Sequence, residues 1–253
     1  MNFPVTITIG PVQILLHVVL EWLGIFIGFR YFLFLRKKKS EPIPDQNRLW
    51  ILVGAIFGAL LGSRLLGSLE NPIEFYHASN PVSFFYENKT IVGGLLGGLI
   101  GVEILKKIIG ETKNSGDLFV YPLLLGLIIG RIGCFSMGVY EETFGQPSNF
   151  ILAMNLGDGI LRHPVTLYEI VFLILIWVVL RITEKKYVLA NGALFKLFMI
   201  AYLSFRLFLD FIKPHYTFPF GLSTIQMACI AGLIYYATFI FYPSKLIVHK
   251  LPS

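Results

Sequence analysis

Apolar residues recur along the chain in seven long stretches, with shorter polar segments between them. Most of these stretches approach the roughly 20 mostly apolar residues that an α-helix needs to cross a bilayer. The pattern therefore predicts an all-α, polytopic integral membrane protein with about seven transmembrane helices. The predicted helices lie near residues 12–34, 49–67, 91–109, 118–137, 165–182, 193–212 and 222–242.

Composition and charge add an orientation to this prediction. Of the 253 residues, 55% are hydrophobic and only 14% are charged, and the mean hydropathy is +0.72. Lys and Arg collect after the first, third, fifth and seventh predicted helices. Because cytoplasmic loops carry the basic excess, we expect the N-terminus outside and the C-terminus in the cytoplasm. The net charge of +6 is then mostly a topology signal, and no nucleic-acid partner is expected.

No linker or low-complexity stretch divides the chain, so residues 1–253 are expected to form a single membrane-embedded domain. The opening ten residues contain no basic residue, which argues against a removable signal peptide. The two cysteines, Cys134 and Cys229, make neither a disulfide framework nor a metal-ligand pattern. The sequence therefore predicts no metal site and no cofactor.

Glycine repeats at every fourth position on two of the predicted helices. Such spacing lets two helix backbones approach closely inside a membrane, and helix packing is sufficient to explain it. The glycines are Gly54, Gly58 and Gly62 in the second helix and Gly93, Gly97 and Gly101 in the third.

Three arginines lie toward the outer ends of their predicted helices, where a buried charge costs several kcal/mol. Arg64, Arg131 and Arg206 would together form a phosphate site if they converged, because guanidinium groups bind phosphate oxygens bidentately. The alternative is that each arginine extends to the headgroup layer or pairs with an acid. Asp210 lies four residues after Arg206 and could be such a partner.

His163 precedes Pro164 at the expected start of the fifth helix, about one turn before Tyr168 and Glu169. A histidine tuned by a neighbouring carboxylate could act as a general base. An interfacial polar cap anchored by Tyr168 is the alternative. The long outer loop 138–164 could contact lipid headgroups or form a solvated turn.

Several motifs, taken in order, resemble the prolipoprotein diacylglyceryl transferase family over most of the chain. The family moves diacylglyceryl from phosphatidylglycerol to the lipobox cysteine thiol of a prolipoprotein, and it lies in the bacterial cytoplasmic (inner) membrane as a multi-pass protein. The resemblance also implies seven helices and an outer N-terminus. Its motifs are GGLLGG (93–98), Asp117, GRIG (130–133), Gly145 with Pro147, the RHP…LYE stretch (162–169) and Arg206 with Asp210.

The resemblance implies roles for particular residues. Arg131 and Arg206 would hold the lipid phosphate and stabilise charge on the departing glycerol phosphate. His163 or Glu141, with Glu142 beside it, would help to form the acceptor thiolate. The expected partners are phosphatidylglycerol, a prolipoprotein signal peptide with its lipobox cysteine, and membrane lipid. Further candidate substrate contacts are Arg64, Gly93, Gly94, Gly133, Cys134, Gly145, Tyr168 and Asp210.

The chain departs from the family pattern at several places. Val92 stands where the family has a histidine, Cys134 where it has an asparagine, and Val139 where it has an acid. The first helix carries His17 and Glu21 in the region where a tyrosine is expected. Without a histidine at position 92, another group must accept the thiol proton, or the arginines must lower the thiol pKa unaided.

Three function classes stay open at this point. The first is a diacylglyceryl transferase or a close relative; the second is a non-catalytic phospholipid-binding membrane protein with the same fold. The third is a transporter-like protein, which the lack of internal repeats disfavours. Within the first class, the thiol of Cys134 could itself accept the lipid before passing it on, or Cys134 could be a small packing residue.

Overall fold

The computed structural model describes residues 3–38 and 43–250, and most of these residues are helical. Each of the seven predicted stretches contains a helix. The longer helices are α1 (Leu16–Lys38), α2 (Asp45–Ser68), α5 (Ile91–Ile109), α6 (Val120–Met137), α7 (Val165–Lys186), α8 (Ala193–Leu209) and α9 (Thr224–Tyr235).

Short elements connect these helices. The short helices are α3 (Pro72–His77), α4 (Pro81–Glu87) and α10 (Ala237–Phe241), with 3-10 turns η1 (Asp117–Phe119), η2 (Gly138–Tyr140), η3 (Asp210–Ile212) and η4 (Pro243–Leu246). Three two-stranded antiparallel sheets pair β1 (Thr6–Ile9) with β2 (Val12–Leu15), β3 (Met154–Asn155) with β4 (Leu161–Arg162), and β5 (Tyr187–Leu189) with β6 (Ile247–Lys250).

Two predicted helix boundaries were wrong. Residues 12–15 form β2 of a hairpin rather than the start of the first helix, which begins at Leu16. The hairpin is rich in Thr, Ile and Val, which favour strands, and it turns at Gly10 with a φ of 60°. The last predicted helix is interrupted at Tyr236, which separates α9 from α10.

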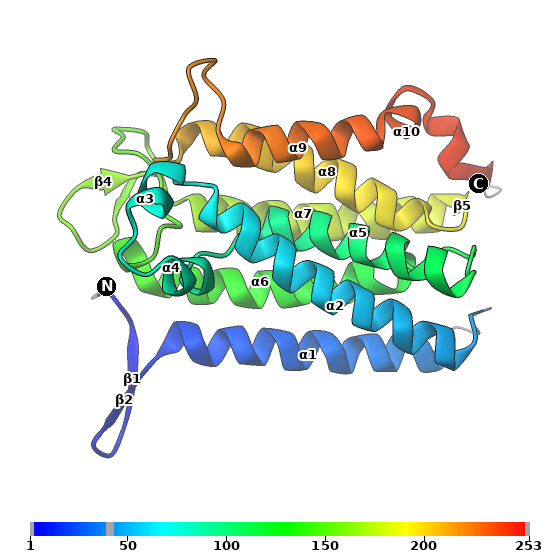
Figure 1. Ribbon diagram of the computed structural model, residues 1–253, viewed down its shortest axis with the longest axis horizontal. Coiled ribbons are helices and arrows are strands. Elements are labelled where there is room, and N and C mark those ends of the chain that lie inside the picture. The colour runs from blue at the N-terminus through cyan, green and yellow to red at the C-terminus, as the bar shows by residue number, and fades with distance from the viewer. Residues whose placement is uncertain (1–2, 39–42, 251–253) are drawn as a thin grey trace.

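The long helices lie side by side and roughly parallel to one axis, with the hairpin projecting at one end (Figure 1). Helix α2 packs along α5, and α1 packs along α6. The apolar core centres on α8, whose Phe198, Met199 and Leu203 are fully buried, as is Val92 of α5. A helix surrounded in this way can hold polar side chains at defined positions inside the bundle.

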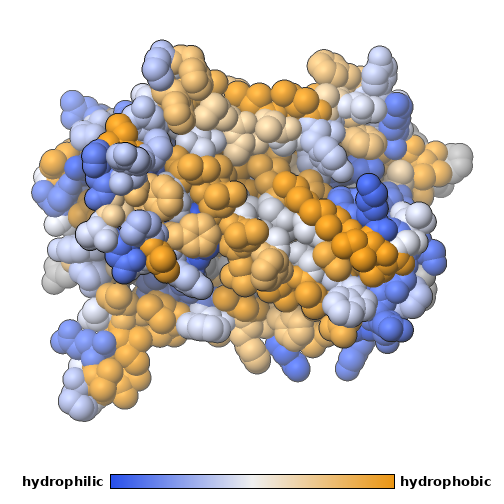
Figure 2. Space-filling model, viewed as in Figure 1, coloured by the Kyte–Doolittle hydropathy of each residue, from blue (hydrophilic) through white to orange (hydrophobic). Residues whose placement is uncertain are grey.

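Four helical segments of the described residues are long and apolar enough to cross a membrane. They are Leu16–Lys38, Asp45–Ser68, Asp117–Tyr140 and Val165–Lys186. Figure 2 shows apolar side chains across the middle of one face and hydrophilic side chains gathered at both ends. This distribution supports an integral membrane protein, because a bilayer solvates an apolar belt and water solvates the ends.

The two glycine ladders pack directly against each other. A Cβ atom at Gly97 would lie 2.3 Å from the carbonyl oxygen of Gly58, and one at Gly101 would lie 2.1 Å from that of Gly54. A Cβ atom at Gly93 would lie 2.3 Å from the carbonyl oxygen of Gly62. These clashes show that α2 and α5 approach to backbone contact, so the packing interpretation of the ladders is confirmed.

We expect Gly97→Ala to destabilise the protein by about 1–3 kcal/mol, because the methyl group would push two backbones apart. Gly94→Ala is the matched control on the same helix, since its Cβ atom would lie 3.7 Å from Ser63 Cβ. Unfolding titrations in mixed micelles with an anionic denaturing detergent would measure both variants. Equal stability of the two variants would contradict the packing interpretation.

Candidate active site

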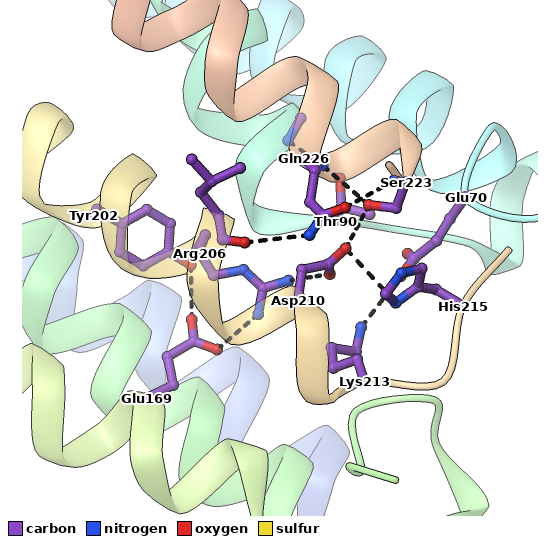
Figure 3. A network of polar contacts seen from close by, with 12 residues as sticks. Glu70, Thr90, Glu169, Tyr202, Arg206, Asp210, Lys213, His215, Ser223 and Gln226 are labelled. Atoms are coloured by element: carbon purple, nitrogen blue, oxygen red, sulfur yellow. Dashed lines mark hydrogen bonds and ion pairs between the residues drawn. The ribbon is translucent and has the colours of Figure 1, made fainter. Parts of the chain in front are cut away.

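A buried carboxylate lies at the centre of the polar residues inside the bundle. Glu169, in the second turn of α7, is 1% exposed. Its Oε2 atom lies 2.9 Å from Arg131 Nε and 3.5 Å from Arg206 Nη1. Its Oε1 atom accepts a hydrogen bond of 2.6 Å from the hydroxyl of Tyr202 (Figure 3). One carboxylate therefore joins residues of α6, α7 and α8.

Helix α8 and the turn that follows it present polar residues on one face. Tyr202, Arg206 and Asp210 are spaced by four residues and are all buried. Asp210 Oδ1 lies 4.0 Å from Arg206 Nη2. Its Oδ2 atom accepts a hydrogen bond from Ser223 Oγ and lies 3.7 Å from His215 Nδ1 (Figure 3). Asp210 thus connects Arg206 to the start of α9.

The start of α9 is held by a capping box. Ser223 Oγ accepts from the Gln226 backbone N–H at 3.0 Å, and Gln226 Oε1 accepts from the Ser223 backbone N–H at 2.9 Å. Both residues are fully buried. The cap satisfies helix N–H groups and also orients the Ser223 hydroxyl toward Asp210.

A second ion pair closes the same end of the bundle. Lys213 Nζ lies 3.1 Å from Glu70 Oε1, and the Lys213 carbonyl accepts from Gln146 Nε2 at 3.1 Å. The backbone N–H of Gln146 donates to the Ile212 carbonyl at 2.8 Å. These contacts tie the loop that follows α6 to the segment that follows α8.

On its other side, Arg131 contacts a second polar cluster. Arg131 Nη1 donates to Cys134 Sγ at 3.6 Å, and the thiol lies 3.7 Å from Glu141 Oε1. Glu141 Oε2 lies 3.4 Å from His17 Nδ1 of α1. Arg131 is therefore shared between the Glu169 network and this cluster.

The second cluster continues to the surface through Glu21. His17 Nε2 lies 3.5 Å from Glu21 Oε2, and Glu21 Oε1 accepts a hydrogen bond from Lys89 Nζ. Glu21 and Lys89 are 40% and 37% exposed, so the chain of contacts runs from the buried centre toward solvent.

Several residues predicted from the sequence are brought together. Arg131 and Arg206 meet at Glu169, Asp210 adjoins Arg206, and Cys134 adjoins Arg131. Glu141 reaches the same group through Cys134. The proposed pairing of Arg206 with Asp210 is present, but it does not replace the convergence of the two arginines.

Among the described residues, the contacts of Arg64 do not include this group. Its Nη1 atom donates to the Tyr86 carbonyl, and its guanidinium carbon lies 5.9 Å from the centre of the Tyr86 ring. The convergence expected for three arginines is thus limited to two.

His163 also lies differently from the expectation. Its Nδ1 atom lies 3.2 Å from the hydroxyl of Tyr168, while the adjacent Glu169 faces the arginines. Of the two alternatives, the contacts favour the polar cap anchored by Tyr168, because the Glu169 carboxylate pairs with the arginines instead.

The glycines named as candidate substrate contacts differ in their surroundings. A Cβ atom at Gly133 would lie 3.2 Å from the His17 carbonyl, and one at Gly145 would lie 2.6 Å from the His163 carbonyl. Gly93 faces α2, as described above, whereas Gly94 has no atom closer than 3.7 Å to its Cβ position. Close approach at three of these positions is between protein segments, and a substrate role for any of them stays a prediction.

Sequence reasoning missed several members of the site. Tyr202 could have been found from its i, i+4 spacing to Arg206, and Ser223 with Gln226 from the S-x-x-Q capping pattern. The sequence offers Glu169 as a neighbour of His163 and as the end of the RHP…LYE stretch, but it does not pair Glu169 with the arginines. No local signal places His17 beside Glu141, because these residues are far apart in the sequence.

Comparison with known proteins gives a consistent result. A family model described as prolipoprotein diacylglyceryl transferase matches residues 4–242. Relatives named phosphatidylglycerol–prolipoprotein diacylglyceryl transferase include one from Finegoldia magna, 28% identical over 240 residues that cover 91% of each chain. One from Bordetella parapertussis is 31% identical over 234 residues, 83% of this chain and 82% of its own. These matches confirm the resemblance drawn from the motifs and the expected transferase class.

We expect Glu169→Gln to lower the free energy of unfolding by about 3–5 kcal/mol, because it leaves two buried guanidinium groups without their shared counter-charge. Glu184→Gln on the same helix is the control. Glu184 also accepts from a tyrosine, Tyr121, and lies 3.8 Å from Arg181, but it is 26% exposed. Its loss should cost about 1 kcal/mol or less. Similar losses in the two variants, measured by unfolding in mixed micelles, would contradict this account.

Glu142 makes stability depend on pH. Burial, followed by the nearby carboxylates of Glu70 and Glu74, raises the pKa of Glu142 in the folded protein. The folded state therefore holds this proton more tightly than the unfolded chain. Its contribution is full below the ordinary Glu pKa of about 4.3 and is lost as pH rises through the raised value. Glu142→Gln should remove this loss, so the variant should gain stability relative to the parent as pH increases across that window. If the melting temperatures of the parent and the variant changed in parallel with pH, this role of Glu142 would be contradicted.

Proposed function

Since this chain belongs to the prolipoprotein diacylglyceryl transferase family, we propose that it moves a diacylglyceryl group from phosphatidylglycerol to the lipobox cysteine thiol of a prolipoprotein. The single observation that carries the proposal is the convergence of Arg131 and Arg206 on Glu169 inside an apolar bundle. Two guanidinium groups at one place supply more donors than one carboxylate accepts, and their remaining N–H groups suit phosphate oxygens.

The charges support a phosphodiester as the ligand. Arg131, Arg206 and Glu169 together carry a charge of about +1. One phosphodiester anion brings this sum to zero in an interior where an uncompensated charge is costly. The departing glycerol phosphate gains negative charge as its bond breaks, so the arginines stabilise the transition state more than the bound lipid.

The proposed reaction is a displacement at a glyceryl carbon. The thiolate sulfur forms a C–S bond to the CH₂ group of the diacylglyceryl moiety, and the C–O bond to phosphate breaks with its electron pair on oxygen. Glycerol phosphate leaves, and the acceptor becomes a thioether. The thiol proton must pass to a base before or during this step.

The contacts favour Glu141 over His163 as the proton acceptor. Glu141 adjoins the thiol of Cys134, which in turn contacts Arg131, so its carboxylate lies beside the proposed phosphate position. His163 contacts Tyr168 instead. Asp210 serves as a positioning residue, because it holds Arg206 while Ser223 and His215 hold Asp210.

We propose that the chain is one domain that crosses the bacterial cytoplasmic membrane seven times, with its N-terminus outside. Basic residues end α1, α5 and α7 in their last turns, which favours a cytoplasmic location for that end of the bundle. The opposite end of the bundle holds the start of α7 with Glu169, the end of α8 with Asp210 and the start of α9 with Ser223. The site would then face the outer leaflet, where the acceptor cysteine is presented.

One observation favours the second candidate, a non-catalytic phospholipid-binding protein. Val92 is fully buried in the apolar core and offers no group that could move a proton at the position where the family resemblance implies histidine. Turnover therefore depends on another base, and only an assay of transfer separates this candidate from the enzyme.

The test uses purified protein in nanodiscs that contain phosphatidylglycerol, incubated with a lipobox peptide. We expect a peptide mass increase of one diacylglyceryl group, read by mass spectrometry. Arg131→Ala and Arg206→Ala should each lower the rate by about 10²–10³-fold, the usual loss when one donor to a developing anion is removed.

Arg181→Ala is the control, since Arg181 lies near the other end of α7 against Tyr31, Tyr121 and Glu184. It should transfer at the parent rate. Absence of any adduct would overturn the proposed reaction, and phospholipid binding that persisted without transfer would favour the second candidate.

A further inference from the structure

Three metal-ligating side chains of different chemistry converge beside Arg131. His17 comes from the first turn of α1, Cys134 from the last turn of α6, and Glu141 from the segment that follows η2. Ligand atoms of all three lie within 4.8 Å of one another. Imidazole nitrogen, thiolate sulfur and carboxylate oxygen are the three ligand types that zinc accepts in proteins.

The separations fit a tetrahedral ion. Zinc binds nitrogen and oxygen at about 2.0–2.2 Å and sulfur at about 2.3 Å, which places neighbouring tetrahedral ligands about 3.4–3.7 Å apart. His17 Nδ1 and Glu141 Oε2 are 3.4 Å apart, and Cys134 Sγ and Glu141 Oε1 are 3.7 Å apart. These two distances involve different oxygens of Glu141, so its carboxylate must turn for one oxygen to join both other ligands, while the three ligand atoms already lie within 4.8 Å of one another.

Two of these groups are buried without a hydrogen-bond partner. His17 Nδ1 and Glu141 Oε2 face each other, yet neither makes a hydrogen bond in the described part of the chain. The other nitrogen, His17 Nε2, faces the carboxylate of Glu21 at 3.5 Å. With the proton on Nε2, the Nδ1 atom can only accept a hydrogen bond, and it faces Glu141 Oε2, which is also an acceptor. A cation between these two atoms would stabilise the arrangement. A carboxylate behind a histidine is also the usual outer partner of a zinc ligand.

The two charged residues next to these three side chains already have partners. Arg131 is paired with Glu169, and Glu21 is paired with Lys89. A zinc ion with the thiolate of Cys134 and the carboxylate of Glu141 is neutral, so the occupied site carries no net charge in the interior. Binding of the ion displaces the thiol proton of Cys134, because the thiolate is the form that ligates a metal.

We propose that His17, Cys134 and Glu141 bind a zinc ion and leave its fourth coordination position open to an external group. The sequence predicted no metal, because the three ligands are spread over about half of the chain. Metal binding is tested without the transferase reaction, so the two proposals can fail separately. Zinc bound here occupies the Glu141 carboxylate, so the role of Glu141 as proton acceptor applies to the metal-free protein.

The experiment titrates Co²⁺ into the full-length protein in detergent after metals have been removed with a chelator. We expect one equivalent of Co²⁺ to bind, with the near-ultraviolet charge-transfer band of a thiolate ligand and the intense visible bands of tetrahedral coordination. Zn²⁺ should displace it and abolish both signals. Absence of a thiolate band at saturating Co²⁺ would overturn the proposal and favour an imidazolium shared between Glu21 and Glu141.

Variants assign the ligands. Cys134→Ser should lose the thiolate band, and His17→Ala and Glu141→Gln should lose tight binding. Cys229→Ala removes the other, fully buried cysteine and should keep the band. Glu21→Gln should weaken binding by about 10–100-fold, as outer partners of metal ligands do. A band that survived in Cys134→Ser would contradict the assignment.

A measurement on the unmodified chain covers the case in which a variant does not fold. Bound Zn²⁺ should protect Cys134 from alkylation by iodoacetamide, read by peptide mass spectrometry. Cys134 labelling that is the same with and without Zn²⁺ would count against the site.

Discussion

The buried end of this bundle depends on the attraction between one carboxylate and two guanidinium groups. Glu169 is almost fully buried and lies between Arg131 and Arg206, which come from the two helices on either side of α7 in the sequence. Without the carboxylate, two like charges would face each other in an interior that penalises even one. The position of α7 against α6 and α8 is therefore a condition for the arginines to be buried at all.

Apolar packing makes this arrangement precise enough to bind a ligand. Phe198, Met199 and Leu203 of α8 are fully buried and leave its Tyr202 and Arg206 few alternative positions. Beyond the helix, Asp210 and the capped start of α9 hold Arg206 from the other side. The arginines are thus held in place by the protein itself, and the proposed mechanism requires this, because fixed charges stabilise a transition state most effectively when they are oriented in advance.

The sequence predicted the helices well because each long apolar stretch must bury its backbone groups in a helix, whatever its neighbours are. It failed at residues 12–15, where β-branched residues next to a glycine turn form a strand that still reads as apolar. Arg131 and Arg206 could be identified because a charge in an apolar helix is unusual. Their shared partner, Glu169, could not be identified. Whether this carboxylate faces His163 or the arginines depends on how the helices are rotated against each other.

The residues that depart from the family pattern are not scattered in space. One cluster contains Cys134, His17 and Glu141, each of which lies at or beside a departure from the family pattern. This cluster shares Arg131 with the Glu169 network. Arg131 therefore couples the two. A cation held by the cluster changes the charge beside Arg131, and this change alters how strongly Arg131 attracts the proposed lipid phosphate. Cation binding and the proposed affinity of the arginine pair for phosphate should accordingly change together, and the effects of substitutions in the two groups should not be additive.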